Sequence, residues 1–280
     1  MNIHSAVMEG ANILKRKNIK TALLDSEILM AKAIGKDRQY LILNNFKNLK
    51  DKNLKYFQKL IKKRSLRKPI AYITNKKNFW KYDFFVTKDT LIPRPDTEIV
   101  IEQILKLFKH KNRMNILDIG IGSGCILLTI LKEKNNFYGT GIDISKICLN
   151  ISKINATNLK VDKRARFYKT DVDKFVQGKY DLIVSNPPYI NQFNLKYLER
   201  DIFNFEPKLA LDGGLDGLSE IRKVINKSSE LIKKNGKFIL EIGFDQKNKV
   251  VNLLKKKGFY INSTLKDIAK NDRCIVSTKI

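Results

Sequence analysis

The sequence predicts an α/β protein in which an N-terminal helical bundle precedes a doubly wound, Rossmann-like parallel sheet. Three observations lead to this fold class. Apolar residues recur at steps of three and four up to about residue 75, and no proline occurs before Pro69. After Arg113, short apolar strands alternate with helical stretches. A glycine-rich turn and a Pro-Pro loop each follow one of those strands directly, at the edge where such sheets bind ligands.

The composition excludes several classes of protein. Hydrophobic residues make up 43% of the 280 residues and aromatic residues 9%, which argues against disorder. No apolar run approaches the ~20 residues that cross a bilayer, and the N-terminus lacks the apolar core of a signal peptide. Three scattered cysteines match neither a disulfide framework nor zinc spacing. We therefore expect a cytoplasmic protein with no metal and no membrane partner, in the simplest case a monomer.

The net charge of +27 leaves two interpretations open. Of the 55 basic residues 44 are lysine, spread along the whole chain, which suits the codon bias of an AT-rich genome. The segment from Lys47 to Lys68 is denser, with ten basic residues against the single acid Asp51. Such a surface also attracts polyanions, so the charge is compatible with a weak affinity for RNA or the ribosome.

Residues 1–75 are expected to form about four helices, because apolar positions repeat at helical spacing at Ile13, Leu23, Leu24, Ile28, Leu29 and Ala33 and again at Leu54, Phe57, Leu60 and Ile61. Residues 76–112 are expected to form a linker. Its first part, Phe79–Ile92, is rich in aromatic and β-branched residues and predicts a β-hairpin. Pro93 and Pro95 then precede a helix expected at about Thr97–Phe108.

Residues 113–280 are expected to form the sheet domain. Five strands are predicted, at Asn115–Ile119, Phe137–Ile142, Arg166–Thr170, Tyr180–Ser185 and Lys237–Ile242. Helices are predicted between and after them, at Cys125–Lys134, Ser145–Asn155, Leu218–Lys234 and Gln246–Lys257. Two last strands, Tyr260–Leu265 and Cys274–Lys279, are separated by too few residues for a helical crossover, so we expect them to be antiparallel.

The first motif that carries chemistry is Leu117-Asp118-Ile119-Gly120-Ile121-Gly122-Ser123-Gly124, at a strand-to-helix turn. Glycines allow the backbone to turn sharply and approach a ligand. Asp143 ends the next strand, 19 residues after Gly124, where an acid accepts hydrogen bonds from ribose hydroxyls. Structural alternatives remain: Asp143 as the N-cap of a helix at Ser145, and Asp118 as a carboxylate that fixes the loop beneath the glycines. Together the features favour an adenosine-containing cofactor.

The second motif is Ser185-Asn186-Pro187-Pro188-Tyr189, at the carboxyl end of a predicted strand. The two prolines stiffen the backbone and remove two N–H donors, so that carbonyl acceptors remain. The Asn186 carboxamide oxygen and the Pro187 carbonyl then form a pair of acceptors suited to an NH₂ group. Tyr189 offers a ring for a planar group. The alternative is a rigid turn with a packing tyrosine.

At this point the sequence resembles a known family, the PrmC/HemK protein-(glutamine-N5) methyltransferases of peptide-chain release factors. The resemblance covers nearly the whole chain from about residue 20. It rests on N-P-P-Y and on these further stretches: Pro69–Ile73; Phe79-Trp80; Leu91–Glu98 (L-I-P-R-P-D-T-E); Asp181–Ile190; Glu206–Gly214; Glu241–Gly243; and Lys266–Arg273 (K-D-I-A-K-N-D-R).

The resemblance implies a class I, S-adenosylmethionine-dependent methyltransferase sheet. The N-terminal helical domain is expected to dock the substrate, because every cofactor and amide-binding motif lies beyond Arg113 and the helical part holds the Lys-dense stretch. It implies methylation of the glutamine in the GGQ motif of release factors, in translation termination, with S-adenosylhomocysteine as product. Catalytic roles fall on Asn186, Pro187 and Tyr189, and substrate binding on Asn186, Pro187, Pro188 and Tyr189. The implied cofactor-binding residues are Asp118, Gly120, Ile121, Gly122, Ser123, Gly124, Asp143, Asp171, Val172 and Asn186.

One position departs from the family pattern. An aromatic residue often follows the acid that ends the third strand and packs on the adenine, but here Val172 follows Asp171 and the nearest aromatic is Phe175. We therefore expect an aliphatic contact with the adenine.

Other readings stay open at this stage. Arg94 and Glu98 either brace the helical domain against the sheet or contact cofactor or substrate. Asp212-Gly213-Gly214 is expected to be a turn, and His4 and His110 are expected at the surface. The leading rival function is an adenine-N6 DNA or guanine-N2 RNA methyltransferase, and the rival from another class is a non-catalytic RNA-binding protein that keeps a vestigial methyltransferase fold.

Overall fold

The computed structural model describes residues 1–280, which form two compact units. The helical unit comprises Met1–Lys76 together with Glu199–Phe205. The sheet unit comprises Lys77–Leu198 and Glu206–Ile280. We expected Glu199–Phe205 in the sheet domain, and we expected residues 76–112 to form a separate linker. Instead, the structure groups the first segment with the helices and nearly all of the second with the sheet.

The helical unit contains five helices before the sheet unit begins, where the sequence predicted about four: α1 (Ile3–Arg16), α2 (Ala22–Ile34), α3 (Arg38–Leu43), α4 (Asp51–Ser65) and α5 (Ile70–Thr74). Its core is lined by Leu14, Leu29, Met30 and Leu60, which are almost fully buried. Gly10 allows the helices to pack closely, because a Cβ there would lie 2.6 Å from Ser26 Oγ and 2.7 Å from the Phe57 ring.

The short helix α9 (Arg200–Phe205) belongs to the helical unit, where its Asp201 forms ion pairs with Arg64 and Arg67. Arg64 of α4 donates hydrogen bonds to Asp25 of α2 and to Asp201 of α9, each at 2.7 Å. Arg64 and Asp25 are buried, and removing one member of such a buried group leaves an uncompensated charge. This pairing explains why α9 stays with helices that precede it by more than a hundred residues.

The sheet unit opens with a β-hairpin, as predicted, although it is shorter and earlier than the Phe79–Ile92 segment. β1 (Lys76–Phe79) pairs with β2 (Tyr82–Phe85). A 3₁₀ turn at Pro95–Thr97 leads into α6 (Glu98–Leu107). Pro95 occupies the start of that turn, where a missing N–H costs nothing.

The central sheet has seven strands in the order β5-β4-β3-β6-β7-β9-β8. The strands are β3 (Met114–Ile119), β4 (Phe137–Asp143), β5 (Ala165–Lys169), β6 (Tyr180–Ser185), β7 (Ile232–Glu241), β8 (Phe259–Lys266) and β9 (Asp272–Lys279). β3 to β7 are parallel, and β9 is antiparallel to both β7 and β8. The predicted βαβ pattern and the antiparallel tail are therefore confirmed.

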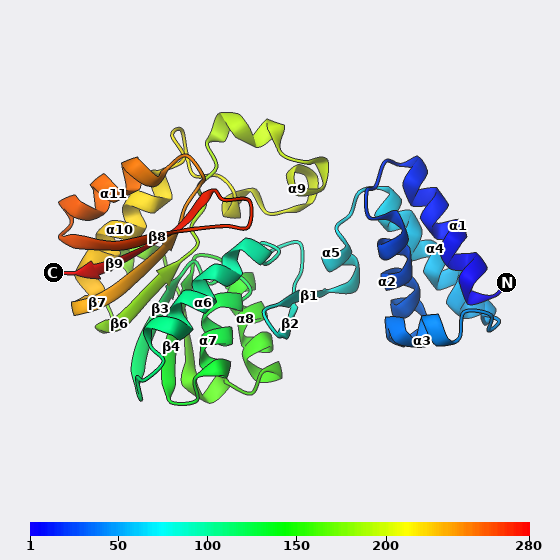
Figure 1. Cartoon of the computed structure of the whole chain (residues 1–280), viewed down its shortest axis with the longest axis horizontal. Helices are drawn as coiled ribbons and strands as arrows, with labels where there is room; N and C mark the ends of the chain where they lie inside the picture. The colour runs from blue at the N-terminus through cyan, green and yellow to red at the C-terminus, as the bar shows by residue number, and fades with distance from the viewer. The chain divides into compact units, whose positions relative to one another are not determined.

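Helices cover both faces of this sheet. Figure 1 shows α6, α7 (Cys125–Glu133) and α8 (Lys146–Asn158) beside one face, and α10 (Ser219–Leu231) and α11 (Lys247–Lys256) beside the other. A continuous apolar core joins β3, β6 and β7 to α10 and α11.

The strand order reverses at the central strand β3, although β3 and both of its neighbours are parallel. β4 and β5 extend the sheet on one side of β3, whereas β6 and β7 extend it on the other. Ligands bind at the carboxyl ends of strands that flank such a switch point. The Ser185 hydroxyl donates a hydrogen bond of 2.7 Å to the Ile119 carbonyl, so the two strand ends are tied together at this point.

Candidate functional site

The glycine loop between β3 and α7 leaves open space where a ligand can approach its backbone. Gly120, Gly122 and Gly124 have φ values of +75°, +56° and +82°, which side-chain-bearing residues rarely adopt. A Cβ at Gly120 would meet nothing within 4 Å, and one at Gly122 would meet only a carbonyl at 4.0 Å. The side chains of Ile121 and Ser123 are buried, so these two residues can reach a ligand only through their backbone.

Asp143 holds this loop in place. Its Oδ2 accepts a hydrogen bond of 3.0 Å from the Gly122 N–H, and its Oδ1 accepts one of 2.8 Å from the Ser145 N–H. Ser145 is itself the N-cap of α8, because its hydroxyl accepts from the Cys148 N–H. Burial raises the pKa of Asp143, opposed by the two backbone N–H groups. Each carboxylate oxygen keeps lone pairs that can accept further bonds from hydroxyl groups.

Asp118 belongs to the end of β3, beneath the glycine loop, and its side chain reaches the first turn of α7. It is 2% exposed, and its Oδ2 accepts a hydrogen bond of 3.3 Å from the Leu127 N–H in the first turn of that helix. Burial raises its pKa to about 7, the Leu127 N–H opposes this, and the charge of Asp143 adds to it. This placement fits the loop-fixing alternative for Asp118 better than direct contact with a cofactor.

The segment after β5 offers an aliphatic surface. Asp171 caps a 3₁₀ turn at Val172–Lys174 by accepting from the Asp173 N–H at 3.0 Å. Val172 is partly buried against the core of the sheet unit. Phe175 is buried in that core, with its ring centroid 5.8 Å from that of Tyr168, so it is not free to stack on a base.

The N-P-P-Y loop is attached to a buried carboxylate that the sequence analysis did not single out. Asn186 Nδ2 donates to Thr97 Oγ1 at 3.4 Å, and Thr97 Oγ1 donates to Glu241 Oε2 at 2.8 Å. The Tyr189 hydroxyl donates to Glu241 Oε1 at 3.4 Å and accepts from Arg273 Nη1 at 3.4 Å. Both ends of the loop therefore converge on Glu241.

Burial sets the charge of these groups. It raises the pKa of Glu241 to about 7, opposed by the bond from Thr97 and by the Arg273 cation. It also raises the pKa of Tyr189, and the neighbouring Glu241 charge adds to that effect. Tyr189 is therefore a neutral hydrogen-bond donor at physiological pH.

The backbone that follows N-P-P-Y is fixed by Asp212-Gly213-Gly214. Ile190 forms a β-bridge with Asp212, and a Cβ at Gly213 would lie 2.9 Å from the Tyr189 carbonyl carbon. Gln246 Nε2 donates to the Tyr189 carbonyl at 2.9 Å. The expected turn is present, since Asp212 Oδ1 accepts from the Gly214 N–H at 2.9 Å, and it also supports the loop.

Arg94 and Glu98 have partners within the sheet unit. Arg94 Nη2 donates to Glu206 Oε1 at 2.6 Å, and the Ile92 N–H donates to Glu206 Oε2 at 3.3 Å. Glu98 Oε1 accepts from the Trp80 N–H at 2.7 Å. These contacts fix the segment that carries Thr97.

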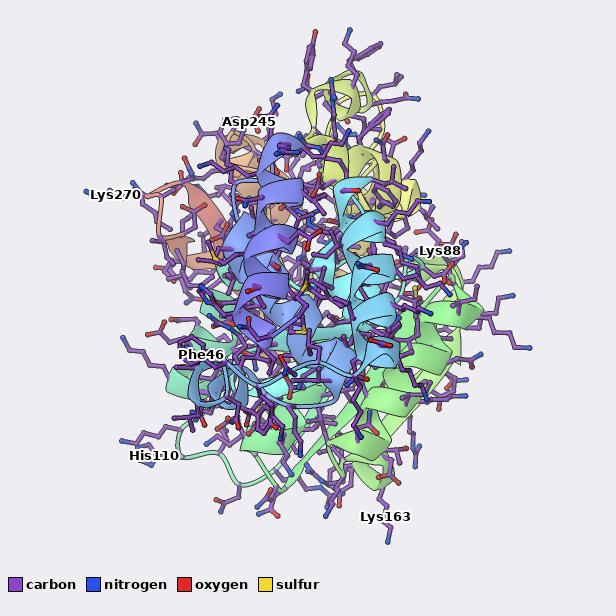
Figure 2. The ribbon with its side chains drawn as sticks, turned by 90° about the vertical axis from the view of Figure 1, so that its right-hand side faces the viewer. Phe46, Lys88, His110, Lys163, Asp245 and Lys270 are labelled. Carbon is purple, nitrogen blue, oxygen red and sulfur yellow. The ribbon has the colours of Figure 1, made fainter.

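Neither histidine takes part in the contacts described above. His4 and His110 are exposed, as predicted, and Figure 2 shows His110 at the periphery of the molecule. No three His, Cys, Asp or Glu side chains gather as metal ligands would. None of the helices combines the length and apolar character needed to span a membrane.

Comparison with known proteins agrees with this geometry. The Methyltransferase small domain family matches residues 96–216, and the PrmC N-terminal domain family matches residues 5–74. A methyltransferase structure from Pyrococcus furiosus is similar in fold, with a TM-score of 0.52 at 18% identity over 70% of this chain and 88% of that one. The strand order, the glycine loop and the acid that ends β4 define a class I, S-adenosylmethionine-dependent methyltransferase.

Full-length relatives give the particular family. The chain is 36% identical to a release factor glutamine methyltransferase of Clostridium acetobutylicum, over 100% of this chain and 99% of that protein. It is 37% identical to one from Buchnera aphidicola (subsp. Acyrthosiphon pisum), with the same coverage of both chains. The chain belongs to the release factor glutamine methyltransferase family, which confirms the predicted fold class and the resemblance.

Sequence reasoning did not single out three residues that contact the N-P-P-Y loop or its support, namely Thr97, Glu241 and Arg273. Each lies in a stretch that carried the family resemblance, but an isolated Thr, Glu or Arg at a strand or helix end has no distinctive spacing. Only the fold brings them together beneath N-P-P-Y.

Proposed function

We propose that this protein transfers a methyl group from S-adenosylmethionine to the side-chain amide nitrogen of the glutamine in the GGQ motif of peptide-chain release factors, as a cytoplasmic monomer. The observation that carries the proposal is the orientation of Asn186. Its NH₂ group is directed to Thr97, so its carbonyl oxygen is left to accept a hydrogen bond from a substrate N–H.

The residues present fit this cofactor. Open space above Gly120 and Gly122 admits a ligand against the backbone, and Asp143 ends the neighbouring strand with acceptor capacity to spare. We propose that these residues, with Asp171 and Val172, hold its ribose, methionine and adenine portions. When bound, the cofactor supplies an electrophilic methyl group on a sulfonium sulfur.

The loop overcomes the weak nucleophilicity of an amide. We propose that Asn186 Oδ1 and the Pro187 carbonyl accept the two N–H groups of the glutamine. These acceptors point the nitrogen lone pair at the methyl group and stabilise the positive charge that develops on nitrogen. Pro187 and Pro188 contribute no N–H donors that could compete for the same acceptors.

Methyl incorporation tests the proposal directly. The full-length protein is incubated with labelled S-adenosylmethionine and, separately, with release factor, total RNA and DNA. We expect label on the release factor alone, lost when its GGQ glutamine is replaced by glutamate. Label on RNA or DNA instead would establish the rival base methyltransferase, and label on none would leave the RNA-binding alternative.

The helical unit is proposed to dock the release factor. Its helix α4 exposes Lys52, Lys55, Lys59, Lys62 and Lys63. Charge reversal tests this better than deletion, because deletion of residues 1–75 would also strip Asp201 of its partner Arg64.

For K55E/K59E we expect a several-fold higher KM for release factor and an unchanged cofactor Kd. The matched control is K111E/K163E, which makes the same charge change on exposed residues of the sheet unit; Figure 2 shows Lys163 extending outward. Equal effects of the two variants would refute docking by α4. Loss of RNA retention by both would identify the charge as a weak, general affinity for polyanions.

A further inference from the structure

The buried hydrogen-bond chain beneath N-P-P-Y has a direction. We propose that Thr97 and Glu241 are positioning residues that determine which end of the Asn186 carboxamide faces the substrate amide. The inference rests on the proposed function, because it assigns the supporting groups of the same site.

The direction begins at the carboxylate. An ionised Glu241 can only accept hydrogen bonds, so the Thr97 hydroxyl must donate its single hydrogen to Oε2, at 2.8 Å. The Thr97 oxygen is then left with lone pairs only. The one group of Asn186 that can bond to it is the NH₂ group, at 3.4 Å. The carboxamide oxygen therefore points to the opposite side.

The same carboxylate orders the other end of the loop. The Tyr189 hydroxyl donates to Glu241 Oε1 and accepts from Arg273 Nη1. Asp267 accepts from Arg273 Nε at 3.2 Å and from Nη2 at 2.9 Å, and the Ile242 carbonyl accepts from Nη1 at 3.3 Å. This gives a role to the C-terminal K-D-I-A-K-N-D-R stretch: it fixes the arginine that supports Tyr189.

Burial protects this hydrogen-bond chain from competing water. Thr97 and Glu241 are each 2% exposed, so water does not compete for these bonds. The charged groups that act on Glu241 are the Arg273 cation, which favours its ionised form, and Asp96, which opposes it. Cys125 and Cys274 also lie near Glu241, and burial raises the pKa of each thiol, so both are neutral.

A proton on Glu241 would reverse the chain. The protonated acid can donate to the Thr97 oxygen, which frees the Thr97 hydrogen to point at Asn186. The carboxamide would then turn its oxygen inward and present NH₂ to the substrate, where an acceptor is needed. The pKa of Glu241, raised to about 7, places this change within an accessible pH range.

Three variants test the assignment in single-turnover methyl transfer to release factor, with cofactor Kd and thermal stability measured in parallel. Thr97→Val keeps the shape and removes the hydroxyl, and we expect the rate to fall on the order of 10–100-fold with cofactor Kd within about twofold. Thr97→Ser restores the hydroxyl and should keep most of the wild-type rate. Glu241→Gln can accept from only one of the two hydroxyls and should lose about tenfold.

The pH dependence of the rate distinguishes a role of Glu241 in orienting the Asn186 carboxamide from a role in packing alone. The wild-type rate should decline as pH falls below about 7, whereas that of Glu241→Gln should lack this limb, because its amide does not titrate. Asp118 and Asp143 also have raised pKa values, so any part of the limb that persists in Glu241→Gln belongs to these two carboxyl groups and not to Glu241.

The outcomes separate this inference from the proposed function. A wild-type protein that does not methylate release factor overturns the function itself. If the wild type is active, a full rate in Thr97→Val, or a Thr97→Ser variant as slow as Thr97→Val, overturns the positioning role. Should Thr97→Val fail to fold, the comparison of Thr97→Ser and Glu241→Gln with wild type decides the question through the pH limb alone.

Discussion

The two loops of the site each stand on a buried acid, and the two acids are used differently. Asp118 beneath the glycine loop and Glu241 beneath N-P-P-Y are both 2% exposed, and burial raises the pKa of each to about 7. Asp118 bonds to a backbone N–H of α7, whereas Glu241 bonds to the hydroxyls of Thr97 and Tyr189. The first acid supports the shape of a backbone, and the second sets the direction of side-chain hydrogen bonds.

This difference predicts how each half of the site fails. The glycine loop depends on backbone conformations that only glycine adopts readily, so damage there should appear as weaker cofactor binding. The N-P-P-Y half depends on acceptors whose interaction grows as charge develops on nitrogen, so damage there should appear in turnover.

Asn186→Ala should cause the largest loss, on the order of 100–1000-fold in turnover, because it removes a preorganised acceptor from the reacting amide. Cofactor Kd, measured by calorimetry, should change little. Asn186→Asp sharpens the test. An aspartate would bring a carboxylate oxygen to the Thr97 oxygen, whose hydrogen is already donated to Glu241. We therefore expect Asp to be as inactive as Ala, although it keeps an acceptor.

Near-wild-type single-turnover rates in Asn186→Ala would show that N-P-P-Y is only a rigid turn. The proposed difference between the glycine loop and the N-P-P-Y loop would then be wrong. An active Asn186→Asp variant would instead show that the acceptor alone matters and that Thr97 does not constrain it.

Asp143→Ala should weaken cofactor binding by roughly 1–3 kcal/mol, because the ribose loses a charged acceptor and the Gly122 N–H loses its partner. Asp143→Asn is the matched control, since it keeps one oxygen for the loop and should lose less. At saturating cofactor both variants should turn over within a few-fold of wild type. An unchanged affinity of Asp143→Ala by calorimetry would contradict the ribose role.

The fold of the sheet unit could be read from the sequence because its information is local. The alternation of apolar strands and helices predicted that the strands are parallel. The short gap before Cys274 predicted that the last two strands are antiparallel, as observed. The position of α9 could not be predicted in this way. Asp201 of α9 is tied to the helical unit by partly buried ion pairs with Arg64, 137 residues away in sequence, and with Arg67, and isolated ion pairs leave no periodic pattern.

The residues of the candidate site also fall into a group with a local sequence motif and a group without one. Glycines at positive φ and the rigid N-P-P-Y loop carry their chemistry in adjacent residues, so their motifs are visible in the sequence. The supporting groups come from three separate elements: Thr97 precedes α6, Glu241 ends the parallel strand β7, and Arg273 lies in the antiparallel strand β9. They come together only because β7 and β9 pair in the folded sheet. The sequence could therefore indicate the acceptors but not the groups that orient them.

The smallest effect on activity should come from Asp118→Asn, which keeps an oxygen for the Leu127 N–H. Its effect should appear in stability. Because the pKa of Asp118 is about 7 in the folded protein and 3.8 in its ordinary state, ionisation is less favourable after folding. Asp118 therefore contributes most to stability below about pH 4, and that contribution is lost as pH rises to about 7. Relative to the variant, the wild-type free energy of unfolding should fall by ~1–4 kcal/mol across this window. Denaturant unfolding at several pH values measures this difference, in which the identical titration of Glu241 cancels. A difference that stays constant from pH 4 to pH 8 would mean that Asp118 titrates as an ordinary carboxylate and that equal burial does not raise the pKa of the two acids alike.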